Sequence, residues 1–419
     1  DVTALHALAA QLGDSGKQAD VALREANYAR FTGDYPTALA AAQAALTHAQ
    51  VAGDLTTQAR SYHEWGRLLW QQGQYDDSRT RLSEALALAR AIGDQLQEAR
   101  SFYDIATAYY EQSDYAEAET CYQQALPLYQ RVGYRRGEID CRMMFGSIHY
   151  QTGQYIAAQQ DYEEALAVAR TIGWRLAEAF LLGNLGNNYF DMGDYLQSEH
   201  YHLQALAICR ETGNRLREAM SLDTLGLVYY AFERGEEAQA HYQQALAIQR
   251  DMGARRDEAY TLHHLGLALE NIKDYEQAHQ IFTQARRIRQ ELEQIALTMD
   301  DLAGSMRVAA AMGKGEVARA YVEEILTWLA DHSPDGIEFP VLVYLSCYQV
   351  LAATSAGPED IQRARAVLEA GHALLQQRAG QIQDEVIRRQ FLEQVPFNRA
   401  LLEAWEAQGC LQGQAAVEK

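Results

Sequence analysis

The chain has 419 residues, of which 48% are hydrophobic and 22% charged, with only six prolines. This composition is typical of a folded globular protein and excludes an intrinsically disordered chain. Acidic residues outnumber basic ones 57 to 36, and the resulting formal charge of −21 repels phosphate backbones and anionic bilayers. We therefore expect neither nucleic acid nor a membrane surface as a partner.

The five cysteines are scattered, odd in number and without a CxxC pair, which argues against a disulfide framework or a zinc site. A reducing cytoplasm fits this usage, and no metal or cofactor is predicted. The first residues do not resemble a signal peptide, and the chain starts at Asp1 instead of methionine. These features indicate a portion of a longer cytoplasmic protein.

The main organising feature is a repeat of forty residues, which must be recognised before domains are counted. One column of the repeat holds glycine at each turn: Gly53, Gly93, Gly133, Gly173, Gly213 and Gly253. A second column holds Gly66, Ala106, Gly146, Gly186, Gly226 and Gly266. A third holds Tyr35, Tyr75, Tyr115, Tyr155, Tyr195 and Tyr275, interrupted by Gly235, and a fourth is alanine from Ala45 to Ala285.

Each repeat contains two runs with the helical period of apolar residues, so each is predicted to be a helical hairpin. In the unit 173–213 we expect helix A over 176–191, a turn at 192–194 and helix B over 195–211. Gly213 then supplies a left-handed C-terminal cap, and Asn214 caps the next helix A. The column of Gly186 allows the two helices to approach closely.

Charged columns accompany the small ones. Glutamate recurs in the first turn of helix A, as at Glu98 and Glu218, and arginine recurs near the end of helix B, as at Arg90 and Arg210. Both placements suit the helix dipole. We interpret them as structural positions.

The spacing Leu185-Gly186, Tyr189, Gly193-Asp194-Tyr195, Ser198 and Ala205 resembles the tetratricopeptide repeat (TPR) signature in a forty-residue form. One departure is His202, where other rows have tyrosine or phenylalanine. The resemblance implies an all-α fold, a right-handed superhelix (α-solenoid) of seven to eight hairpins. We expect a partial helix over 1–13, the solenoid over 14–330, and divergent capping helices over 331–419, near 338–354, 359–379 and 383–407.

Several strings resemble catalytic signatures but are incomplete. "GDSG" at 13–16 falls in the inter-repeat glycine column, "HEWGR" at 63–67 lacks the second histidine of a zinc protease, and Gly-Lys at 16–17 and 313–314 lacks the Ser/Thr of a phosphate-binding loop. His200 and His202, like His263 and His264, have the wrong spacing for ligation from one helix, so we interpret them as packed or surface histidines; a metal site completed by a second helix is the alternative. No catalytic residue is predicted, and the chain is not expected to be an enzyme.

TPR superhelices line a concave groove with their helices A, so the resemblance assigns the candidate ligand-binding residues to that face. In this register the groove holds His63, Arg67, Trp70, Tyr103, Tyr110, Tyr150, Asn184, Asn187, Phe190, Asp223, Tyr230 and His263.

An aromatic stripe at helical spacing is also what a core produces, so the aromatic members of this set have a structural alternative. As a groove, stiff aromatics beside variable polar positions suit a protein or peptide ligand. Peptide-binding TPRs place asparagine on helix A to hold the ligand backbone, as Asn184 and Asn187 would. The lysine-rich clamp for C-terminal carboxylates is absent, which disfavours chaperone tails.

The opening segment and the ending "AGQIQDEVIRRQFLEQVPFNRALLEAW" resemble the flanks of C-terminal TPR regions in bacterial STAND ATPases and MalT-like regulators. That resemblance implies a noncatalytic sensor arm of a signalling protein, with an NTPase or effector domain upstream in the full-length chain. The alternative is a free-standing scaffold that bridges partner proteins.

Overall fold

The computed structural model describes residues 9, 11 and 13–417, and over these residues the protein is helical without any β-strand. The partial helix expected over 1–13 lies almost wholly outside the described residues. Among the helices described, none is both long and apolar enough to cross a membrane.

The chain divides into two compact units, the first formed by residues 1–151 and 160–173, the second by residues 152–159 and 174–419. In the first unit the helices are α2 (Ser15–Phe31), α3 (Tyr35–Ala52), α4 (Leu55–Gln71), α5 (Tyr75–Ile92), α6 (Gln95–Glu111), α7 (Tyr115–Arg131) and α8 (Arg135–Gln151). The next helix, α9 (Tyr155–Thr171), contributes residues to both units.

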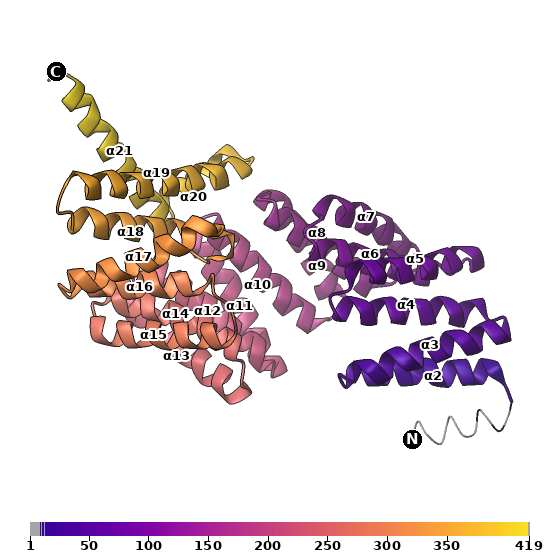
Figure 1. Ribbon diagram of the computed structural model, residues 1–419. Helices are drawn as coiled ribbons and strands as arrows, with labels where there is room; N and C mark the ends of the chain where they lie inside the picture. Colours follow the sequence, from indigo (N-terminus) through magenta and orange to yellow (C-terminus); the bar gives the residue numbers. More distant parts are fainter. Residues whose placement is uncertain (1–8, 10, 12, 418–419) are drawn as a thin grey trace. The chain divides into compact units, whose positions relative to one another are not determined.

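The second unit continues the hairpins and ends in a group of less regular helices (Figure 1). Its hairpin helices are α10 (Arg175–Asp191), α11 (Tyr195–Thr212), α12 (Arg215–Ala231), α13 (Gly235–Met252), α14 (Arg255–Asn271), α15 (Tyr275–Glu291), α16 (Thr298–Ala311) and α17 (Gly315–Asp331). After the short 3₁₀-helix η1 (Pro334–Gly336) follow α18 (Pro340–Ala353), α19 (Pro358–Gln381), α20 (Glu385–Glu393) and α21 (Pro396–Val417).

The hairpin built by α10 and α11 shows how the sequence sets the boundaries. Helix α10 ends at Asp191 as expected, and Tyr195 begins α11. Gly213 has a φ of 68°, the left-handed conformation that an L side chain disfavours, and the side chain of Asn214 accepts a hydrogen bond from the backbone N–H of Arg217. The predicted C-cap and N-cap are both confirmed.

The small-residue column has the steric role inferred from the sequence. A Cβ added to Gly226 would lie 2.3 Å from the ring of Tyr242, and one added to Gly186 would lie 2.4 Å from Nε2 of His202. In these two hairpins the side chain of helix B therefore lies against the bare backbone of helix A, and substitution requires a shift of that side chain.

The charged columns form ion pairs between successive hairpins, which the dipole argument did not predict. Nε of Arg210 lies 3.0 Å from Oε1 of Glu218, and Arg250 contacts Glu258 at 2.8 Å. A spacing of eight residues thus connects the last turn of helix B to the first turn of the next helix A. The signal was present as two charged columns of opposite sign.

The final helices cover part of the repeat array within the second unit. Helix α18 packs against α16, α17, α19 and α21, and two apolar clusters lie between these helices. Met192 at the α10–α11 turn packs with Ile382 and Ile387 of the C-terminal segment. The chain therefore folds back onto the helix-A face of its own repeats.

Candidate ligand-binding site

The twelve candidate groove residues do not form one continuous site in the structure, but lie in several different environments. In the first unit, Nε2 of His63 lies 2.9 Å from the carboxylate of Asp104, and Nε of Arg67 lies 3.6 Å from the same carboxylate. Glu64, beside them on α4, pairs with Arg30. These contacts form a polar, partly exposed surface whose charges already have partners.

The aromatic candidates of the first unit are half-buried. Tyr103 packs edge-on against Tyr122 at a centroid distance of 5.3 Å, and burial raises its pKa well above the usual range. Tyr110 packs against Tyr115 at 5.5 Å. Trp70 and Tyr150 are also half-buried. Each of these side chains is therefore partly packed against neighbouring rings or helices and partly exposed on the helix-A face.

His263 and Asp223 belong to a buried polar network instead of an open groove. His263 is 1% exposed, and its Nδ1 lies 2.8 Å from Oδ1 of Asp301. Burial and the positive charge of Arg289 hold the pKa of His263 well below its usual range, so this contact is a hydrogen bond of the neutral ring. His263 is not accessible to a ligand from solvent, unlike the expectation from the helical register.

The neighbouring His264 carries a positive charge in this network, in addition to that of Arg289. Its Nδ1 lies 3.1 Å from both carboxylate oxygens of Asp223, and its Nε2 lies 2.8 Å from Oε1 of Glu338. Burial alone would lower the pKa of His264, but the two carboxylates raise it to about 10. Asp300 accepts hydrogen bonds from the backbone N–H groups of Glu338 and Phe339. The network therefore ties the segment before α18 to the repeats.

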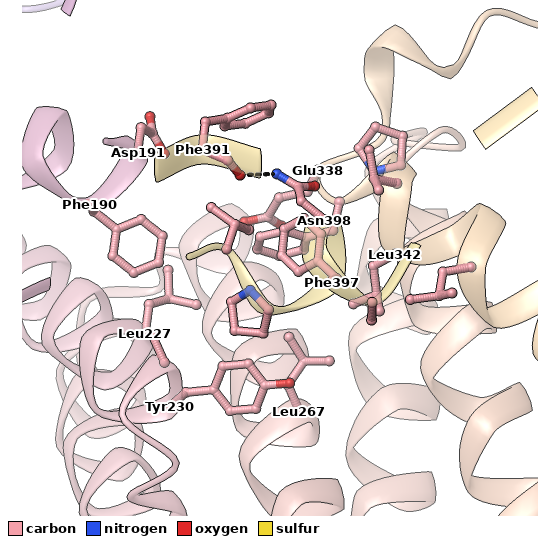
Figure 2. A pocket seen from close by; sticks show the side chains of 18 of the residues that line it. Phe190, Asp191, Leu227, Tyr230, Leu267, Glu338, Leu342, Phe391, Phe397 and Asn398 are labelled. Carbon is pink, nitrogen blue, oxygen red and sulfur yellow. Dashed lines mark hydrogen bonds between the residues drawn. The ribbon is translucent and has the colours of Figure 1, made fainter. Parts of the chain in front are cut away.

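Phe190 and Tyr230 line a cavity of about 400 Å³ that the C-terminal helices close (Figure 2). Leu227 and Leu267 complete the repeat side, while Phe397 and its neighbours form the opposite wall. In the second unit this part of the helix-A face is thus occupied by the chain itself.

Asn184 and Asn187 line a different and smaller cavity of about 50 Å³, here called the His202 pocket. Its lining comes from three consecutive helices: Ala179, Gly183, Asn184 and Asn187 of α10, His202 and Cys209 of α11, and Arg217, Met220, Ser221 and Thr224 of α12. Asn187 and Met220 are exposed, so the pocket is accessible from solvent. The structure brings Gly183, Asn184 and Asn187 together here, and separates them from Phe190.

The pocket exists because His202 stands where other hairpins have a larger ring. At the matching position the hydroxyl of Tyr122 lies 3.0 Å from Oγ1 of Thr107, and the hydroxyl of Tyr162 lies 3.4 Å from Oγ of Ser147. The shorter imidazole of His202 leaves the end of that volume empty beside Asn187. A break in one repeat column was the sequence signal for this site.

His202 has unused hydrogen-bonding capacity. It is 2% exposed, and neither ring nitrogen has a hydrogen-bond partner among the described residues. Burial lowers its pKa to about 4, so the ring is neutral at pH 7 and offers one donor and one acceptor. An unsatisfied buried polar group costs about 1 to 3 kcal/mol, which a ligand could relieve.

Arg217 supplies the charge at the pocket, and the sequence reasoning did not identify it. Its guanidinium lies 4.0 Å from the ring centroid of Phe180, a cation–π contact, and no carboxylate among the described residues pairs with it. Burial lowers the pKa of Arg217. The pocket thus combines two amides, a neutral imidazole and an unpaired cation.

No group of three or more histidine, cysteine or acidic side chains is arranged for a metal ion in the part of the chain that the structure describes.

A profile described as tetratricopeptide repeat matches residues 57–131, 97–171, 176–251 and 235–291. The chain belongs to the tetratricopeptide repeat family. These matches include helices α10 to α12 and therefore the His202 pocket. A comparison with curated proteins finds no match.

Solved structures of TPR proteins share the fold at low sequence identity. The TPR-containing STAND protein of Pyrococcus horikoshii is 18% identical, with a TM-score of 0.62 over 77% of this chain and 49% of its own. The apo quorum sensor NprR of B. thuringiensis is 16% identical, with a TM-score of 0.61 over 77% of this chain and 92% of its own. A Rap protein complexed with competence and sporulation factor is 13% identical, with a TM-score of 0.51 over 87% of this chain and 100% of its own.

Proposed function

We propose that this chain is a noncatalytic, peptide-binding TPR sensor arm of a larger bacterial STAND-type signalling protein, acting in the cytoplasm. The observation that carries the peptide-binding part is the His202 pocket with its unpaired Arg217. The STAND part is supported by the two flanking segments and by the likeness to the P. horikoshii protein. In this proposal residues 331–419 cap the solenoid formed by residues 14–330.

The pocket fits an extended peptide that carries an acidic side chain. Asn184 and Asn187 present amides on one helix face, and an amide can both donate to and accept from a peptide backbone. Arg217 can form a bidentate contact with a carboxylate while it stacks on Phe180. The cavity volume admits a carboxylate group or a pair of water molecules, so it selects one side chain and not a whole ligand.

The descriptions of two structurally similar proteins are consistent with such a role. One is described as a quorum sensor and another is complexed with a competence and sporulation factor. Their low identity supports the fold alone, so the ligand class rests on the pocket.

The binding part is tested with a synthetic library of eight-residue peptides in which each sequence occurs with glutamate and with glutamine at one position. Fluorescence anisotropy should identify peptides that bind only in the glutamate form. Arg217→Gln should weaken these about tenfold or more, because a charge-assisted hydrogen bond contributes about 1.5 to 3 kcal/mol. The double variant Asn184→Ala/Asn187→Ala should also lose binding.

Arg256→Gln is the matched control, since Arg256 is an exposed arginine of the following repeat that forms no ion pair among the described residues. Equal affinity of all variants for the selected peptides would contradict the proposal, as would a library without any glutamate-dependent binder. The sensor-arm part is contradicted by a complete gene that encodes neither an NTPase nor an effector domain.

A further inference from the structure

The cavity behind Phe190 and Tyr230 has the size and lining of a small-molecule site. Its volume of about 400 Å³ falls in the range of ligand pockets, which are about 300 to 1,000 Å³. Repeat helices α10, α12 and α14 supply one wall, and residues of α18, α19, α20 and α21 supply the other (Figure 2). Most of this surface is aromatic or aliphatic.

A buried amide on this wall has an oxygen atom without a hydrogen-bond partner among the described residues. Asn398 is 0% exposed, and its Nδ2 donates to the backbone carbonyl of Phe391 at 2.9 Å. Its Oδ1 has no hydrogen-bond partner among the described residues. Because an unsatisfied buried acceptor is costly, this oxygen is a ready site for a donor on a ligand.

The lining of the cavity also holds a cation that forms no direct ion pair among the described residues. Arg378 of α19 lines it, is partly buried, and pairs with no carboxylate among residues 13–417 that the structure describes. Two acidic groups line the same cavity. The charge of Glu338 is balanced by His264 and Arg289, and Asp191 lies at the edge beside Phe391 (Figure 2). The guanidinium of Arg378 is therefore the one cationic group among the described residues of the lining, and it forms no ion pair there although Asp335 acts on it at longer range.

We propose that this cavity binds an amphipathic organic anion. The apolar body of the ligand fills the space between Phe190, Leu227 and Phe397, its acid group pairs with Arg378, and a hydrogen-bond donor on it reaches Oδ1 of Asn398. This site is separate from the His202 pocket and does not depend on peptide binding there. Since both walls come from different parts of the chain, ligand binding would also fasten the C-terminal helices to the repeats.

The test uses two fluorescent probes with the same aromatic framework on the full 419-residue chain. 1-Anilinonaphthalene-8-sulfonate carries an anionic group and an N–H donor, and N-phenyl-1-naphthylamine has the same skeleton without the sulfonate. We expect one saturable sulfonate site per chain, weakened about tenfold or more by Arg378→Gln. The neutral probe should change by less than about twofold in that variant, since it lacks the charge that Arg378 pairs with.

Leu227→Trp places a larger ring in the cavity and should weaken saturable binding of both probes, whereas Arg217→Gln, at the other pocket, should leave both unchanged. Circular dichroism checks that each variant is folded. If Leu227→Trp does not fold, the effect of Arg378→Gln on the two probes still tests the proposal. The proposal is overturned if sulfonate binding is unsaturable, if its affinity is unchanged in folded Leu227→Trp, or if Arg378→Gln weakens both probes equally. Glutamate-peptide binding measured on the same samples reports separately on the His202 pocket.

Discussion

His202 and His264 are both buried imidazoles of the second unit, and their surroundings move their pKa values in opposite directions. His202 has no partner on either nitrogen, and burial lowers its pKa to about 4. For His264, burial also favours the neutral form, but Asp223 and Glu338 raise its pKa to about 10. Desolvation is common to both rings, so the carboxylates decide the difference.

The comparison separates a structural cluster from a binding site. Around His264 each ring nitrogen is bonded, and the network fixes the segment that leads into α18. Around His202 there is an empty volume, an unpaired arginine and two amides near solvent. Unused hydrogen-bonding capacity beside accessible space is what a ligand can exploit, whereas a satisfied network contributes to folding.

The largest expected effect comes from breaking the satisfied network with His264→Gln. Removing the imidazolium leaves the carboxylate of Asp223 without its cation and leaves Glu338 with Arg289 alone, which should cost about 3 to 5 kcal/mol at pH 7. Urea unfolding monitored by circular dichroism measures this loss. The exposed His200→Gln is the matched control and should be close to neutral.

The same pair of proteins has a defined pH dependence. The folded pKa of His264 lies above the value of about 6.5 in the unfolded chain, so its stabilising contribution is fully present below pH 6.5 and is lost as pH rises toward 10. The stability difference between wild type and His264→Gln should shrink over that window. A constant difference would show that His264 is not charged in the folded protein.

The second effect concerns acid conditions and His202. Its folded pKa of about 4 lies below the unfolded value, so protonation favours the unfolded chain as pH falls from 6.5 to 4. The lost stability should reach about 3 kcal/mol at pH 4, since one pKa unit corresponds to about 1.4 kcal/mol. Comparison with His202→Tyr isolates this contribution, because the carboxyls of Asp300 and Asp301 titrate in both proteins.

Much of the fold can be predicted from the sequence, because the same residue types recur at the same structural positions in successive repeats. The glycine column, the caps at Gly213 and Asn214 and the helix boundaries are local steric rules, and the repetition removes ambiguity. The polar network could not be predicted, because its members come from four helices and from Glu338, which has lost the repeat register. Their proximity depends on where the C-terminal segment docks.

The candidate site was only partly predictable for the same reason. Asn184 and Asn187 were identified from their helical register, but His202 was noted only as an irregularity, and Arg217 lay outside the groove columns. Phe190, three residues after Asn187, lines a different cavity because the C-terminal helices cover that part of the face. Register predicts which face a residue occupies, but not what covers that face.

The third prediction fills the His202 pocket. His202→Tyr restores the ring found in other hairpins, and its hydroxyl can reach residue 187 as Tyr122 reaches Thr107. Filling about 50 Å³ should stabilise the protein by about 1 kcal/mol at about 24 cal/mol per Å³. Thermal unfolding measures the gain, and binding of the selected glutamate peptides should fall at the same time. A stabilised variant that keeps full affinity would place peptide binding elsewhere.

The smallest effect is expected for a pair whose arginine is half exposed and whose carboxylate, that of Glu218, also contacts Arg215 at 3.1 Å. Arg210 and Glu218 form a contact of 3.0 Å between successive hairpins, but half of the arginine side chain is accessible to water. Water and salt screen such a pair, so Arg210→Gln should cost about 0.5 kcal/mol or less, and 0.5 M salt should remove most of the difference. Urea unfolding at low and high salt measures both values. If Arg210→Gln lowered the free energy of unfolding as much as His264→Gln, independently of salt, the contrast between the two sites would be wrong. Burial of a charge pair would then contribute less to stability than the pairing itself. The expected contrast would instead locate the electrostatic stabilisation of the second unit in the network that holds its C-terminal helices.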